Sequence, residues 1–260
     1  MMSEKNSLES HKLVRRLITN LEPVIRESAD HLAQLAKDSG KLRNEGGRTL
    51  PEPYPYHHEV FRYAQRLLNG VRTMKDVHTY LLRFPQPATY TKQGIGPDRW
   101  IEYHYSTYVV TVCSLYDIAL ILTNVVFRLG IPVRQCKDDI ITGNRWVERT
   151  RVKSALDSLN GHVKPYREPR NLYAHRGEVP DLEHLDLLKL LTLVQPHAPA
   201  LVDPGEIPYL YDRDSGALRN KIQAECASFE KAISDLFDAL LPIYEVWAKT
   251  IGPSNTTLTT

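Results

Sequence analysis

The sequence has few cysteines and little net charge. Its three cysteines, Cys113, Cys136 and Cys226, have no paired spacing, which argues against a disulfide framework and against a zinc knuckle. The net charge is only +2, so bulk charge alone does not hold the chain to nucleic acid. The unpaired cysteines fit a reducing compartment. With 260 residues and 42% apolar content, the chain can bury a substantial core.

We also expect no secretory signal, because the first ten residues are polar and contain no apolar segment. One apolar run, residues 105 to 127, is nearly long enough to span a bilayer. Asp117 lies near its middle, and a carboxylate at that depth costs about 2.5 to 3.5 kcal/mol. We therefore expect a buried core helix, a cytoplasmic location and no membrane contact. A membrane-associated helical protein is the weaker alternative.

Charge is unevenly distributed along the chain. Between Arg128 and Arg176 eleven basic residues face five acidic ones, a balance of +6. Between Glu178 and Asp238 five basic residues face twelve acidic ones, a balance of −7. This asymmetry indicates either an anionic ligand at the middle of the chain or electrostatic pairing of the two segments within the fold.

Apolar residues recur at steps of three and four, which is typical of helices packed on a core. Glycine and proline clusters at 40–55, 94–97 and 130–132 predict the breaks between these helices, and no strand pair is indicated. The sequence therefore predicts an all-α bundle. The expected helices cover residues 8–38 (one helix, or two if Pro23 divides it), 60–81, 100–129, 146–159, a segment from Arg170, 182–194 and 217–249, with a long loop at 196–216.

The segment REPRNLYAHRGE, residues 167 to 178, combines an arginine, a polar residue and a histidine. Arg170, Asn171 and His175 carry this pattern, and it resembles the signature of the HEPN superfamily. The resemblance implies a HEPN-like helical bundle at 97–252. We expect an N-terminal helical extension at 1–96 before it and a disordered tail at 253–260 after it. The resemblance also implies a metal-independent endoribonuclease whose site is shared across a homodimer.

The spacing alone has little weight, because other pairs in the chain match it. Arg26 and His31 match, as do Arg99 and His104, and Arg72 and His78 match with one more residue between them. Context favours Arg170, since this pair alone has a proline that suits the first turn of a helix, an adjacent asparagine and basic surroundings.

The predicted chemistry uses Arg170 and His175 as catalytic residues. Imidazole exchanges protons near neutral pH and can remove the 2′-hydroxyl proton of RNA. A guanidinium presents a planar set of donors that matches the oxygens of the phosphorane. This chemistry requires no cofactor and no metal, and the resemblance implies a 2′,3′-cyclic phosphate product. The adjacent pair His57 and His58 is a poor metal site, so we expect it in a loop or a helix cap.

Helix geometry argues for two copies of the chain. Five helical steps turn about 500°, so Arg170 and His175 point roughly 140° apart. One copy therefore brings them poorly to one phosphate, whereas two copies related by a two-fold axis can bring an arginine from one beside a histidine from the other.

Other residues are candidates for support or RNA contact, each with an alternative. Asn171 orients the motif or contacts phosphate, or it forms a helix-terminal hydrogen bond. Tyr173 packs in the core or stacks on a base. Arg167 and Arg176 follow the RNA backbone or are merely exposed. Asp117 forms a buried polar line with Ser114 and Asn124, and it orients His175 or pairs with another helix.

The leading prediction is a HEPN-type endoribonuclease acting on RNA, in the manner of a toxin or defence effector controlled by an antitoxin or another regulatory protein. The alternative is a non-catalytic HEPN-like module that binds nucleotide, RNA or a partner protein.

Overall fold

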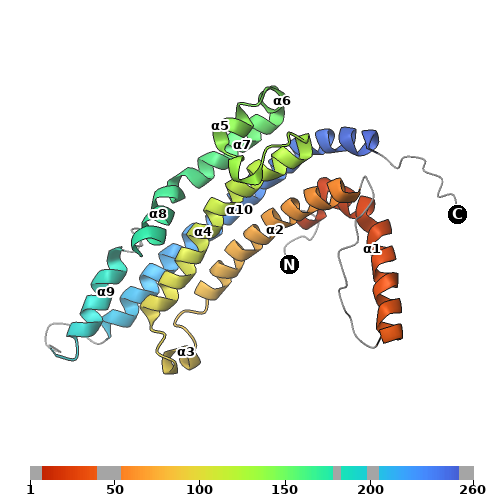
Figure 1. The fold of residues 1–260 in the computed structure, drawn as a ribbon. Coiled ribbons are helices and arrows are strands. Elements are labelled where there is room, and N and C mark those ends of the chain that lie inside the picture. The colour runs from red at the N-terminus through yellow and green to blue at the C-terminus, as the bar shows by residue number, and fades with distance from the viewer. Residues whose placement is uncertain (1–7, 40–53, 178–182, 198–204, 252–260) are drawn as a thin grey trace. The chain divides into compact units, whose positions relative to one another are not determined.

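The computed structural model describes residues 8–39, 54–177, 183–197 and 205–251. Every regular element within these ranges is helical, so the all-α prediction is confirmed (Figure 1). The predicted disordered tail at 253–260 lies outside the described residues. The elements are η2 (Leu8–Ser10), α1 (Lys12–Ser39), α2 (Tyr54–Leu81), α3 (Ala88–Lys92), α4 (Pro97–Phe127), η3 (Val133–Gln135), α5 (Asp138–Thr142), α6 (Arg145–Glu148), α7 (Arg151–Val163), η4 (Lys164–Tyr166), α8 (Arg167–Arg176), α9 (Glu183–Val194) and α10 (Glu206–Thr250).

The chain forms two compact units, and each contains segments that are far apart in the sequence. The first unit is Met1–Leu68, Ile118–Leu156 and Ile233–Thr260, and the second unit is Asn69–Asp117 and Asp157–Ala232. Both units take residues from each side of residue 96, where the sequence predicts the end of the N-terminal extension. The segment 167 to 178 with the arginine and histidine pattern belongs to the second unit.

Tyrosine side chains with polar partners organise the core of the first unit. The hydroxyl of Tyr244 accepts a hydrogen bond from Asn20 Nδ2 at 2.7 Å and lies 2.9 Å from His57 Nδ1. Tyr56 stacks on Tyr244 with ring centroids 5.8 Å apart, and its hydroxyl donates to the backbone oxygen of Val126 at 3.1 Å. Buried hydroxyls thus find partners within the unit, as burial requires.

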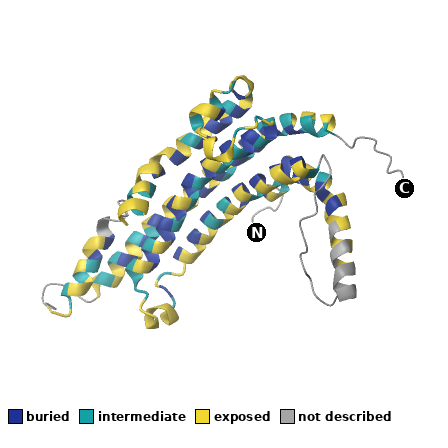
Figure 2. Ribbon diagram, in the orientation of Figure 1, coloured by how far each residue is buried: buried dark blue, intermediate teal, exposed yellow. Residues whose placement is uncertain are grey.

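Large apolar side chains fill the core of the second unit. Most residues of α4 are buried or half-buried and few are exposed (Figure 2), so this helix is enclosed on most of its sides. The fully buried side chains of this unit include Met74, Leu81, Ile101, Tyr105, Tyr108, Tyr116 and Phe229. This core is the layer on which α8 rests.

Several predicted helix boundaries are wrong, and proline explains two of them. α8 begins at Arg167 and not at Arg170, so Pro169 lies within its first turn, where a missing N–H costs nothing. α10 begins at Glu206 and not at Ala217, with Pro208 likewise in its first turn. The predicted loop at 196–216 therefore ends early. α3 and α5 lie outside all the predicted helices.

The predicted helix at 146–159 is divided into α6 and α7. Thr150 separates them, and its hydroxyl accepts a hydrogen bond from the N–H of Val152 at 3.2 Å, as an N-terminal cap does. Asn144 caps α6 in the same way through the N–H of Trp146 at 3.0 Å. α1, in contrast, continues as one helix through Pro23.

α4 is long and apolar enough to cross a membrane, judged by length and composition alone. Of its most apolar stretch, 61% is buried, as in the core helix of a soluble protein.

Candidate functional site

α8 carries the Arg170 to His175 motif in its middle and last turns. The helix has ten residues, with Arg170 at the fourth position and His175 at the ninth. It ends at Gly177, whose φ of 70° places it in the left-handed region that favours glycine. The N–H of Gly177 donates to the backbone oxygen of Tyr173 at 2.9 Å. His175 is therefore held in the last turn of a well-terminated helix.

Glu225 of α10 fixes the start of α8. Its Oε2 accepts hydrogen bonds from the hydroxyls of Tyr166, the residue before α8, and of Tyr108 on α4. The two tyrosine rings meet edge to face with centroids 5.6 Å apart. Burial raises the pKa of Tyr108, and the neighbouring Tyr166 and Glu225 raise it further. Tyr108 thus remains a neutral donor that links α4, α10 and the start of α8.

Arg170 is turned toward α4. It is half-buried, and its Nε is buried without a hydrogen-bond partner in the part of the chain that the structure describes. Its guanidinium lies beside the thiol of Cys113: burial raises the pKa of that thiol, and the positive charge of Arg170 opposes the rise. Cys113 also donates to the backbone oxygen of Tyr166 at 3.3 Å. The Nε side of the Arg170 guanidinium therefore faces the core.

His175 lies on the exposed side of α8. Arg167, Asn171 and His175 follow one another at steps of four residues, so they share a helix face, and all three are exposed. Arg167 is held in place, since its Nη2 donates to Asn160 Oδ1 at 2.6 Å and its guanidinium lies 5.5 Å from the ring centroid of Tyr116. The structure thus groups His175 with Arg167 and Asn171 and separates it from the surroundings of Arg170.

Tyr173 and Arg176 complete the predicted contact residues. Tyr173 is half-buried, and its ring makes no aromatic contact among the described residues. Arg176 is exposed in the last turn of α8. Both positions allow contact with a ligand on the outer side of this helix.

Asp117 does not lie in a buried polar line, so that prediction is wrong. Asp117 is exposed, and Ser114 donates to the backbone oxygen of Val110 at 2.8 Å within its own helix. Asn124 is buried and closes the loop after α4 through hydrogen bonds with Ile131 at 2.9 and 3.1 Å. In the described part of the chain no hydrogen bond or ion pair joins Asp117 to His175.

The competing pairs have different surroundings. His104 is only 6% exposed, and its ring lies between those of Tyr80 and Trp100 at centroid distances of 5.1 and 4.4 Å. Burial lowers the pKa of His104 to about 4. Arg26 pairs with Glu22 at 2.6 Å, while the side chain of His31 is not among those described. His78 is half-buried on α2.

Sequence reasoning missed the residues that support α8, namely Cys113, Tyr166 and Glu225. One signal was available, because Glu225 stands between Ile222 and Phe229 on the apolar face of its helix. A carboxylate at such a position requires hydrogen-bond donors. The identity of those donors depends on tertiary packing.

Within the described residues no group of three or more His, Cys, Asp or Glu side chains is placed to hold a metal ion. His57 and His58 lie in the first two turns of α2, so the prediction of a loop or cap is wrong for both. His57 is buried against Tyr244, whereas His58 is exposed.

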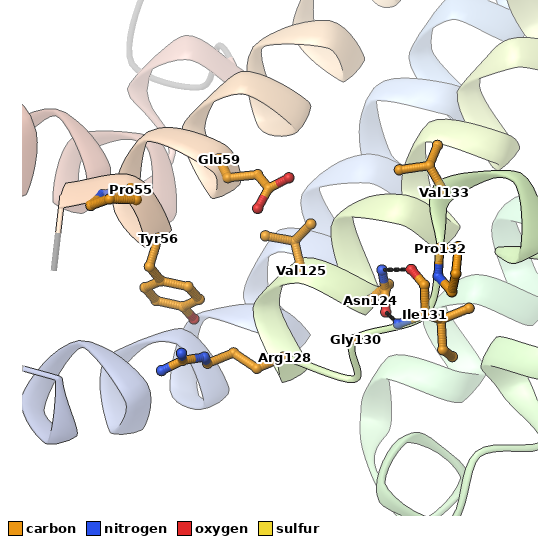
Figure 3. A pocket seen from close by; sticks show the side chains of 10 residues that line it. All are labelled: Pro55, Tyr56, Glu59, Asn124, Val125, Arg128, Gly130, Ile131, Pro132 and Val133. Carbon is orange, nitrogen blue, oxygen red and sulfur yellow. Dashed lines mark hydrogen bonds between the residues drawn. The ribbon is translucent and has the colours of Figure 1, made fainter. Parts of the chain in front are cut away.

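A cavity of about 530 Å³ lies in the first unit, between the start of α2 and the loop that follows α4. Figure 3 shows Tyr56 and Arg128 close together in its wall, and the guanidinium lies 5.8 Å from the ring centroid. Asn124 holds the loop in place. None of the predicted catalytic or RNA-binding residues lines this cavity.

Comparisons with protein-family models, with curated proteins and with solved structures give no match to this chain.

Proposed function

We propose that this protein is an endoribonuclease of the HEPN type that cleaves RNA without a metal, at a site shared by two copies of the chain. The observation that carries the proposal is the exposed face of α8, where His175 stands in line with Asn171 and Arg167. Tyr166 and Glu225 fix the start of this helix, so these side chains project from a supported backbone. A supported helix is a better base for catalysis than a loop.

In the proposed reaction His175 removes the proton of the 2′-hydroxyl. The 2′-oxygen forms a bond to phosphorus and the bond to the 5′-oxygen breaks, while the imidazolium returns a proton to the leaving oxygen, directly or through water. Arg170 stabilises the charge on the phosphorane. The products end in a 2′,3′-cyclic phosphate and a 5′-hydroxyl.

Incubation of the purified protein with total RNA in EDTA tests this proposal. General acid–base catalysis contributes about 10²- to 10⁴-fold to a rate, and one donor that stabilises the charge of the transition state contributes about 10²- to 10³-fold. His175→Ala and Arg170→Ala should therefore each lose at least a hundredfold in cleavage. His197→Ala is the matched control, because His197 is also an exposed histidine of the second unit. Cleavage that survives both changes at α8 rejects the proposal.

Mixing the two inactive variants tests the shared site. In a mixed dimer one site combines both substitutions and the other is intact. Random exchange of subunits should therefore restore about a quarter of the wild-type activity. A site contained in one chain would give no recovery, because neither variant has both residues.

The second candidate function is a non-catalytic module of the same type that binds nucleotide, RNA or a partner protein. The position of Arg170 favours it, since its Nε is buried and its guanidinium lies beside Cys113. RNA binding without cleavage, lost in Arg176→Ala and Arg167→Ala, would support this candidate. A role as a toxin or defence effector predicts toxicity on expression that His175→Ala relieves.

A further inference from the structure

A second cavity lies in the second unit and contains none of the residues of the proposed cleavage site. Its volume is about 630 Å³, which is within the usual range for small-molecule sites. Four segments form it: the residues after α2, the start of α4, α9 and the start of α10. Its lining includes Phe84, Gly96, Asp98, Thr192, Tyr209, Tyr211 and Asp212.

The walls are mainly apolar and carry aromatic rings. Phe84 and Tyr211 form one wall, with ring centroids 6.5 Å apart and planes tilted by 43°. Tyr209 is 65% exposed at the start of α10, so its ring is free to cover an occupant. Surfaces of this kind bind apolar and aromatic bodies.

Every charged side chain in the described lining is a carboxylate. Asp98 is half-buried and Asp212 is exposed, and neither has an ion-pair partner in the described part of the chain. An ionised group beside apolar surface is stabilised when an opposite charge with hydrogen-bond donors approaches it. The charge of this lining therefore favours a cation.

The charge of Asp98 reaches into the cavity. Burial raises the pKa of Tyr211, the hydrogen bond with Thr192 opposes this, the negative charge of Asp98 raises the pKa again, and the positive charge of Lys189 lowers it. Lys189 is not among the lining residues, and its charge is paired with Glu102 and Asp186. The hydroxyl of Tyr211 consequently stays protonated and neutral near pH 7, so it adds a polar contact without adding charge.

Gln86 holds one side of the cavity in shape. Its Nε2 donates to the backbone oxygen of Ile95 at 3.3 Å and lies 3.4 Å from Thr91 Oγ1. This link fixes the segment between α2 and α4, which contributes Phe84 and Gly96 to the lining. A wall that is ordered before binding reduces the entropy cost of complex formation.

We propose that this cavity binds a small molecule that has an apolar, ring-bearing body and a protonated amine. The body lies against Phe84 and Tyr211, and the ammonium group donates hydrogen bonds to Asp98 and Asp212. The proposal goes beyond RNA cleavage and does not depend on it, since it uses none of the residues of α8.

Three probes that differ only at one end test this proposal: 4-phenylbutylamine, 4-phenylbutanol and 4-phenylbutyrate. Each is titrated into the full-length protein, and the amide resonances of Gly96 and Thr192 are followed by nuclear magnetic resonance. A charge-assisted hydrogen bond changes affinity by about tenfold or more. The amine should therefore bind at least tenfold more tightly than the alcohol, and the carboxylate should bind most weakly.

The double variant Asp98→Asn and Asp212→Asn removes the charge and keeps the shape. It should bind the amine about tenfold more weakly and the alcohol with unchanged affinity, and the alcohol titration thereby shows whether the cavity is intact. Asp76→Asn, an exposed carboxylate elsewhere in the second unit, should change nothing. Equal affinity for the three probes, binding of the amine that the double variant retains, or no shift at Gly96 and Thr192 would overturn the proposal.

Discussion

Two segments of the second unit have the same spacing of arginine and histidine and very different surroundings. On α8 the pair is Arg170 and His175, with the histidine exposed. On α4 the pair is Arg99 and His104, with the arginine exposed and the histidine packed between Tyr80 and Trp100. An imidazole whose pKa is lowered to about 4 is uncharged near neutral pH and is closed to substrate.

The comparison teaches that the two helices use histidine for opposite purposes. α4 is a core helix and uses the ring of His104 as an aromatic side chain. α8 contains no buried residue, so its position depends on contacts in its first half, through Tyr166 and Glu225 and through Arg170 beside Cys113. Exposure on a supported helix, rather than spacing, distinguishes the candidate site.

The largest expected effect comes from removing the support of α8. Glu225→Ala leaves the hydroxyls of Tyr108 and Tyr166 without their shared acceptor. Since hydrogen bonds to a charged group contribute about 1.5 to 3 kcal/mol each, the free energy of unfolding should fall by about 4 kcal/mol. Chemical denaturation measures this change.

Glu225→Gln is the matched control for this support. Its amide oxygen still accepts hydrogen bonds, so it should lose about half as much stability. In Glu225→Ala the helix α8 should become disordered, and RNA cleavage should therefore fall. In Glu225→Gln cleavage should persist. A stability change within 0.5 kcal/mol, about the size of a surface substitution, would mean that Glu225 does not hold α8.

The next effect concerns pH and His104. The pKa of this side chain falls from 6.5 to about 4 on burial, so the unfolded chain takes up a proton at a higher pH than the folded chain does. The contribution of the buried, neutral His104 to the free energy of unfolding is therefore fully present above pH 6.5. It decreases by about 3 kcal/mol as the pH falls toward 4. The difference in stability between pH 7 and pH 4 should be smaller by this amount in His104→Phe.

His197→Gln serves as the control for this pH dependence, because the side chain of His197 is exposed. It should retain the full acid sensitivity of the wild type. If His104→Phe loses stability with acid as steeply as the wild type, His104 does not titrate from a buried position. His104→Phe should also retain RNA cleavage, in contrast to His175→Ala.

The sequence predicts the helices well because their apolar periodicity records burial directly. It misses the starts of α8 and α10, where Pro169 and Pro208 lie in the first turn although they resemble helix breakers. The exposed position of His175 agrees with the polar composition of its segment. Two contacts could not be predicted: that of Arg170 with Cys113 and that of Glu225 with Tyr166. Each joins residues more than fifty positions apart in the sequence, and no local pattern encodes such a contact.

The smallest expected effect concerns Asp117, which the sequence predicts to orient His175. Asp117 is exposed and has no described contact with His175, so Asp117→Asn should leave the cleavage rate within about twofold of wild type, as for an exposed charge without a partner. Kinetics with a short defined RNA measure this. A loss of tenfold or more would contradict this expectation and would place Asp117 in the site, where its charge lies near Cys113 and therefore near Arg170.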